Sequence, residues 1–243
     1  MDSGKNNDSV VGGAVDIGFG TSDKSRGILS LDYEHTLDAN GDGDQTNFYR
    51  QIAYAQNFVV SDGSWVVRPY FGVGDSKDFG DNEDGASTDY SFYGLGISKR
   101  LEAVNFDVQV GRVDSSDYYG ETIDHGFFTG VTMDYKHSDA VTLSARAFSL
   151  RGDRWNETTP NDANVRIQNV TLGAQYRQAN SSMTYWANFD HADHDAQNES
   201  DDPYASETRI GLTYHFGNLG GVSSHRYLPN LGRWISFSVN EIE

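Results

Sequence analysis

The chain has 243 residues, with 36 acidic against 18 basic side chains and a formal net charge of −18 at pH 7. A chain this acidic is unsuited to binding the phosphate backbone of nucleic acids, which excludes nucleic acid as a partner. It has no cysteine, which excludes disulfide frameworks and thiolate metal sites, and no apolar run approaches the roughly 20 residues of a transmembrane helix.

Alternation of apolar and polar residues recurs along the chain and predicts β-strands. Aromatic residues make up 13% of the chain, and it holds 26 glycines but only 4 prolines, a mix that favours strands and turns. In chain order the candidate strands include residues 11–19, 29–34, 65–74, 93–98, 104–111, 127–136, 170–177, 183–190, 209–216 and 233–241. The alternation predicts about twelve strands, the first and last being the weakest.

The candidate strand 65–74 illustrates the pattern. One of its faces carries Trp65, Val67, Pro69, Phe71 and Val73, whereas the other carries Val66, Arg68, Tyr70, Gly72 and Gly74. A soluble sandwich also alternates in this way, so a second feature is needed to separate the two classes. The candidate strands span on the order of ten residues, as tilted membrane-spanning strands require.

Connections between the candidate strands alternate between short and long. Short ones fall at 61–64, 102–103, 137–140 and 178–181, and long ones at 38–45, 75–89, 114–124, 151–164 and 191–207. This alternation is typical of outer-membrane barrels, which have short periplasmic turns and longer outer loops. The sequence therefore predicts an all-β fold: a closed antiparallel up-and-down transmembrane β-barrel of about 10–12 strands. We expect a disordered segment at 1–9, the barrel at 10–217, and an extension at 218–243 that can supply one further strand.

Charged and amide side chains recur on the polar faces of these strands and are the candidate lining of the barrel interior. They are Arg68, Arg100, Asp107, Gln109, Asp134, Lys136, Arg146, Gln175, Arg177, Asp190 and Arg209. One interpretation is a water-filled lumen whose lining selects solutes. The other is a sealed lumen in which these groups pair with each other, because narrow barrels are filled by side chains.

Two stretches have the composition of metal sites. Asp38, Asn40, Asp42 and Asp44 lie at alternate positions with glycines between them, as in the start of a calcium loop. An ordinary acidic hairpin loop is the alternative, since the EF-hand's twelfth position would be Tyr49. Residues 190–195, Asp-His-Ala-Asp-His-Asp, offer imidazole and carboxylate ligands to a transition metal, or are solvated loop side chains.

The segment from Glu207 to Phe216 resembles the closing strand of Gram-negative outer-membrane barrels, which commonly ends in an aromatic residue. In size and loop design the chain is similar to the small monomeric porins of the oligogalacturonate-channel type. The resemblance covers the layout of most of the chain and rests on no family-specific motif. It implies a bacterial outer-membrane location, with the lipid bilayer and lipopolysaccharide as surroundings.

The leading functional prediction is a porin-like outer-membrane channel for passive diffusion of small polar or charged solutes, such as saccharides. The alternatives are a closed structural or surface-interaction barrel with ligand-binding outer loops, and an outer-membrane lipid hydrolase. No GxSxG elbow or HExxH motif is present, so the sequence predicts no enzyme and no cofactor beyond the calcium ion considered above. A catalytic cluster assembled across strands would leave no such signature, and a Ser or His beside a carboxylate at the outer rim would favour the hydrolase.

Overall fold

The computed structural model describes residues 9–22, 24–37, 46–60, 63–79, 87–115, 123–154, 163–179, 181–196, 204–214, 228–229 and 231. Eleven strands account for most of these residues. They are β1 (Ser9–Ser22), β2 (Ser25–Leu37), β3 (Thr46–Val60), β4 (Trp65–Phe79), β5 (Ser87–Arg100), β6 (Val104–Ser115), β7 (Ile123–Lys136), β8 (Val141–Arg154), β9 (Ala163–Tyr176), β10 (Met183–Ala196) and β11 (Tyr204–Tyr214).

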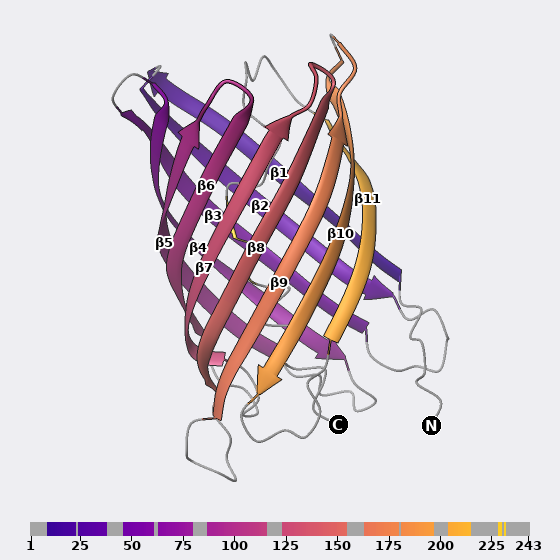
Figure 1. Cartoon of the computed structure of the whole chain (residues 1–243). Coiled ribbons are helices and arrows are strands. Elements are labelled where there is room, and N and C mark those ends of the chain that lie inside the picture. The colour runs from indigo at the N-terminus through magenta and orange to yellow at the C-terminus, as the bar shows by residue number, and fades with distance from the viewer. Residues whose placement is uncertain are drawn as a thin grey trace.

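The strands form one antiparallel sheet in which each strand pairs with its neighbours in the chain, in the order β1 to β11. The sheet curls around an interior, with the strands strongly tilted (Figure 1). The short turns predicted at 61–64, 102–103, 137–140 and 178–181 all join an odd-numbered strand to the next one, and lie at the upper end in Figure 1. The even-numbered strands from β2 to β10 finish at the opposite end. The all-β, antiparallel up-and-down architecture predicted from the sequence is thus confirmed, as is the number of strands.

One of the short turns needs a glycine. Gly63, between β3 and β4, has a φ of 89°, a left-handed conformation that side-chain-bearing residues rarely adopt. Its N–H donates a hydrogen bond to the carbonyl oxygen of Val60 at 3.4 Å, which tightens the turn. The strands on either side then pair from Val60 and Trp65 onward.

The convex face of the sheet is apolar and exposed. Phe71 is 59% exposed and Leu172 is 56% exposed, whereas Tyr70, next to Phe71 in the chain, is 3% exposed. In every described strand from β2 to β11, the apolar row likewise lies on the exposed outer face. A contiguous apolar surface of this extent is suited to hydrocarbon and not to water. Among the described residues, no helix is long and apolar enough to cross a membrane.

The sheet has two edges, β1 and β11. Among the described residues these two strands do not pair with each other, and Ile210 on β11 is 80% exposed. With eleven strands, β1 begins at the long-loop end and β11 finishes at the short-turn end. The candidate strand 233–241 and the predicted disordered segment, apart from Ser9, lie outside the described residues.

Candidate functional site

The interior of the barrel holds the buried side chains, and its lining changes character along single strands. On β7, Phe128 is buried towards the long loops and Asp134 is buried towards the short turns, both on the inner face. On β5 the same change runs from Phe92 to Ser98. We call the two parts the apolar zone and the polar zone. The apolar zone comprises Tyr70, Tyr90, Phe92, Val113, Ile123, Phe128, Phe148, Leu150, Val165 and Ile167. The polar zone comprises Arg68, Ser98, Asp107, Gln109, Thr132 and Asp134.

Arg68 is the centre of the polar zone. Its side chain is 1% exposed, and its guanidinium forms an ion pair with Asp107 on β6. It also donates a hydrogen bond to Ser98 on β5 at 3.2 Å, while the Ser98 hydroxyl donates to Asp107. The three side chains come from three adjacent strands, so the pair is both charge-balanced and hydrogen-bonded, as a buried pair must be.

A second ionic cluster joins the last two strands of the sheet to β2. Arg209 on β11 donates to the carboxylate of Asp190 on β10, with distances of 2.9 Å from Nη2 and 3.2 Å from Nε. Its Nη1 lies 3.4 Å from Glu34 on β2, and its Nε lies 3.6 Å from Glu207. Arg209 therefore connects β11 to β2. The cluster holds three carboxylates for one guanidinium, so it is acidic overall.

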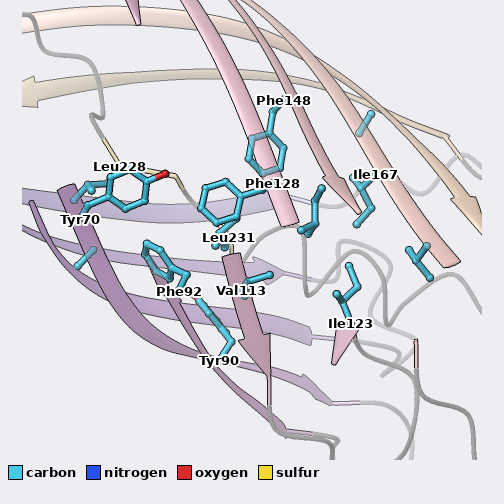
Figure 2. Packing of buried hydrophobic residues seen from close by; sticks show 14 of the residues in the cluster. Tyr70, Tyr90, Phe92, Val113, Ile123, Phe128, Phe148, Ile167, Leu228 and Leu231 are labelled. Atoms are coloured by element: carbon cyan, nitrogen blue, oxygen red, sulfur yellow. The ribbon is translucent and has the colours of Figure 1, made fainter. Parts of the chain in front are cut away.

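The apolar zone is built from aromatic rings that contact each other along the inner wall. Phe128 lies 6.1 Å from Phe148 and 6.4 Å from Tyr70, measured between ring centroids. Two leucines from beyond β11, Leu228 and Leu231, are buried in the same cluster (Figure 2). In that view Leu228 lies beside Tyr70, and Leu231 lies between Phe92 and Phe128. Each such buried side chain contributes about 1.5–3 kcal/mol by leaving water.

Gln51 on β3 holds the stretch around residue 230, of which Leu228, Pro229 and Leu231 are described, inside the barrel. Its side-chain Nε2 donates to the carbonyl oxygen of Pro229 at 2.9 Å, and its Oε1 accepts the backbone N–H of Leu231 at 3.2 Å. The Tyr90 hydroxyl donates to the same Oε1 at 3.3 Å. The short coloured piece of chain between the front and back walls in Figure 1 is this stretch. One side chain thus satisfies two backbone groups that would otherwise be costly to bury.

The structure brings most of the predicted lining residues to the inner face. Those with buried or half-buried side chains are Arg68, Asp107, Gln109, Asp134, Arg146, Gln175, Asp190 and Arg209. Two ion pairs join members of this set, Arg68 with Asp107 and Asp190 with Arg209.

The other three predicted residues, Arg100, Lys136 and Arg177, are exposed at the short-turn rim. Lys136 lies 2.7 Å from Asp139 in the turn after β7, and this ammonium lowers the pKa of the Asp139 carboxyl. Arg177 donates to the carbonyl oxygen of Ser181 at 3.2 Å. These three side chains lie at the rim instead of lining the interior, because each lies at or beyond the end of its strand.

Neither predicted metal site gains support. Asp38, Asn40, Asp42 and Asp44 lie outside the described residues. In the other stretch, Asp190 faces the interior while His191 is on the outer face, because side chains alternate along β10. Among the described residues no group of three or more histidines and carboxylates is placed to hold a metal ion.

Sequence reasoning missed the apolar zone and the role of Gln51. A signal was present, because inward aromatic residues stand opposite glycines on the neighbouring strand. Phe92 pairs with Gly72, and Phe128 pairs with Gly111. A Cβ at either glycine would collide with the ring that lies over it. An aromatic residue on a polar face opposite a glycine therefore indicates a ring lying flat against the inner wall.

No protein-family model matches the sequence, and no curated protein matches it. Among solved structures, the fold is similar to the crystal structure of the beta domain of the Bordetella autotransporter Brka. The TM-score is 0.48 and the sequence identity 15%, over 86% of this chain and 90% of that one. At this level the likeness is one of general architecture alone.

Proposed function

We propose that the protein is a bacterial outer-membrane β-barrel that conducts small polar solutes, such as saccharides, and that its own stretch around residue 230 closes the barrel at rest. The outward apolar rows support a position in a bilayer, with lipopolysaccharide in the outer leaflet. Short turns at one end and longer loops at the other support the outer membrane in particular. The channel is the function that the ionic lining of the polar zone favours.

The closure rests on the contacts of the stretch around residue 230. Leu231 is fully buried and Leu228 is 5% exposed, and both lie within the apolar zone. The side chain of Gln51 forms hydrogen bonds with the backbone of Pro229 and of Leu231. A segment packed and hydrogen-bonded in this way fills the space that a solute would have to cross.

The acidic cluster around Arg209 sets the expected selectivity. Asp190, Glu34 and Glu207 surround the single guanidinium of Arg209. A pore lined with excess carboxylate favours cations and neutral solutes over anions. We therefore expect an opened barrel to be cation-selective.

Conductance in planar lipid bilayers tests the proposal. The wild type should give rare, brief openings. Gln51→Ala, which removes both backbone contacts, and Leu231→Asp, which places a charge in the apolar zone, should give long-lived steps that select for cations. Gln175→Ala is the matched control, because Gln175 is an inward glutamine at the short-turn end of β9. It should behave as the wild type does.

Each other outcome overturns a defined part of the proposal. Steady, long-lived steps from the wild type would show that the stretch around residue 230 does not close the barrel. Silence from all correctly folded variants would reject the channel and favour a sealed barrel that meets partners through its loops. Anion selectivity of the open variants would reject the acidic cluster as the selectivity element.

A further inference from the structure

Three side chains with the chemistry of a hydrolase lie in a line on the outer face of β10 and β11. The Ser206 hydroxyl lies 2.8 Å from Nδ1 of His191, which is its direct partner in the strand register. The other ring nitrogen of His191, Nε2, lies 3.3 Å from a carboxylate oxygen of Asp193. Ser206 is exposed, and the side chains of His191 and Asp193 are 43% and 60% exposed. A substrate in the surrounding lipid can therefore reach all three.

We propose that Ser206, His191 and Asp193 form a serine-hydrolase site that cleaves ester-linked acyl chains of anionic membrane lipids. The proposal rests on the membrane location proposed above and is independent of conduction through the interior. In this site Ser206 is the nucleophile and His191 the general base. Asp193 is a positioning residue, since it acts through the imidazole.

The two contacts of His191 favour one tautomer of its ring. The carboxylate of Asp193 lies 3.3 Å from Nε2 and favours a proton on that nitrogen, which would leave the lone pair of the neutral imidazole on Nδ1. That lone pair faces the Ser206 hydroxyl and accepts its proton. A nucleophile beside a base that is itself oriented by a third group is the arrangement that activates a serine.

The reaction needs only water as a second substrate. The Ser206 oxygen bonds to the carbonyl carbon of the ester while its proton moves to His191. The ester C–O bond then breaks, and the leaving alcohol takes that proton. Water attacks the acyl-serine through the same base, the free fatty acid leaves, and Ser206 regains its proton.

The position of the three residues on the barrel surface identifies the substrate class. On the side towards the short turns, the outward residues Phe189 and Ile210 are apolar and exposed, and Val170, the register partner of His191 on β9, is apolar and exposed as well. On the side towards the long loops, Arg166 on β9 stands opposite Asp195, four residues or about 13 Å beyond His191 along β10. Arg151 on β8 is the register partner of Arg166.

This change along the outer face, from apolar residues towards the short turns to arginines towards the long loops, matches an amphiphile with an anionic headgroup. Acyl chains would lie along the apolar rows, phosphate groups would face Arg151 and Arg166, and the ester linkage would fall between them, at the level of Ser206. Both glycerophospholipids and phosphorylated glycolipids have this layout, so the shared chemistry is an ester-linked acyl chain beneath a phosphate group.

Labelling by a fluorophosphonate in detergent tests the nucleophile without a bilayer. The serine oxygen displaces fluoride at phosphorus, and the probe remains attached to the protein. We expect the label on Ser206, located by mass spectrometry of peptides, and no label in Ser206→Ala. In His191→Ala the labelling rate should fall about 100-fold or more, the usual contribution of a general base. Ser91→Ala is the matched control, since Ser91 is an exposed outward serine on β5, and it should label as the wild type does.

Fatty-acid release from vesicles then tests the substrate class. Wild type should release fatty acid from phosphatidylglycerol vesicles, from vesicles containing lipid A, or from both, and the two arms distinguish the two sources of the linkage. Arg151→Gln combined with Arg166→Gln should raise the KM for these lipids and leave fluorophosphonate labelling unchanged. Release by Ser206→Ala at the wild-type rate, or absence of both labelling and release in folded wild type, would overturn the proposal.

The role of Asp193 has its own readout. Asp193→Asn should lower kcat about 10-fold or more while KM stays unchanged, because the amide no longer fixes the imidazole tautomer. A merely structural role would instead change KM or the amount of folded protein. Ser206→Ala should keep the conductance of the wild type, so failure of the hydrolase and failure of the channel are distinguishable.

Discussion

The polar and apolar zones of the interior are lined by the same strands, at positions of the same parity, yet they bury opposite kinds of side chain. In the polar zone, Arg68 is held by Asp107 and Ser98 across three strands. In the apolar zone, Phe128 and Phe148 pack with Leu231 from beyond the last strand. The inner face of a barrel therefore needs no single character. A strand can turn an ionic row into an aromatic one within a few residues.

The largest expected effect lies in the polar zone. Arg68→Ala leaves the carboxylate of Asp107 buried without its guanidinium, which should cost about 3–5 kcal/mol of unfolding free energy. Urea unfolding of the protein in lipid vesicles measures it. The double substitution of Arg68→Met with Asp107→Leu should recover most of the loss. If the double variant is as unstable as the single one, the cost does not come from the unpaired charge.

In the apolar zone, truncating a side chain should lower the unfolding free energy by leaving a cavity, and not by leaving an unpaired charge. Leu150→Ala removes a fully buried side chain at the inner face of β8 and should cost about 2–4 kcal/mol. Leu143→Ala, on the outer face of the same strand and 43% exposed, is the control and should cost less, because lipid fills the space. Equal costs at the two positions would contradict a dry, packed interior.

A smaller effect is expected from adding a methyl group at a glycine that lies against an inward ring, compared with a glycine on the edge strand. A Cβ at Gly111 on β6 would meet the ring of Phe128, so Gly111→Ala should cost about 1–3 kcal/mol. At Gly13 on the edge strand β1, nothing lies within 4 Å of an added Cβ. Gly13→Ala should therefore be close to neutral in the same unfolding experiment. A neutral Gly111→Ala would mean that Phe128 does not lie against β6.

The smallest effect lies at the rim, outside both zones. Lys136 lowers the pKa of Asp139, so the pair stabilises the fold above the ordinary pKa of the carboxyl and loses this contribution as the pH falls through the lowered value. Asp139 is fully exposed, and screening by water and salt keeps the contribution small. An NMR titration should show the pKa of Asp139 rising towards its ordinary value in Lys136→Ala. An unchanged pKa would contradict the pairing.

Alternation was enough to predict the sheet, its faces and its short turns, because a period of two is set by strand geometry alone. The outward row Val67, Pro69 and Phe71 and the inward Arg68 were all readable from the sequence in this way. The sequence did not show which inward residues contact each other. Arg68 and Asp107, for example, are 39 positions apart and are brought together by the register of the strands.

Other parts of the site depend on contacts that carry no local signature. Gln51 binds the backbone of Leu231, 180 residues away in the chain, and nothing in the surrounding sequence marks it. Ser206 and His191 lie 15 residues apart and meet only because β10 and β11 pair in one particular register. Alternation along the strands placed three further residues in the interior, but the strands end at or before them: Arg100, Lys136 and Arg177.

The position of the outer face of the sheet in hydrocarbon can be tested directly on β7. The chain has no cysteine, so single nitroxide labels can be placed at Val131, Thr132 and Met133 on β7 by cysteine substitution. In bilayers, collision with oxygen should be high at 131 and 133 and low at 132, where the side chain is buried in the interior. Equal accessibility at the three positions, or greater access to oxygen at 132, would contradict the membrane barrel.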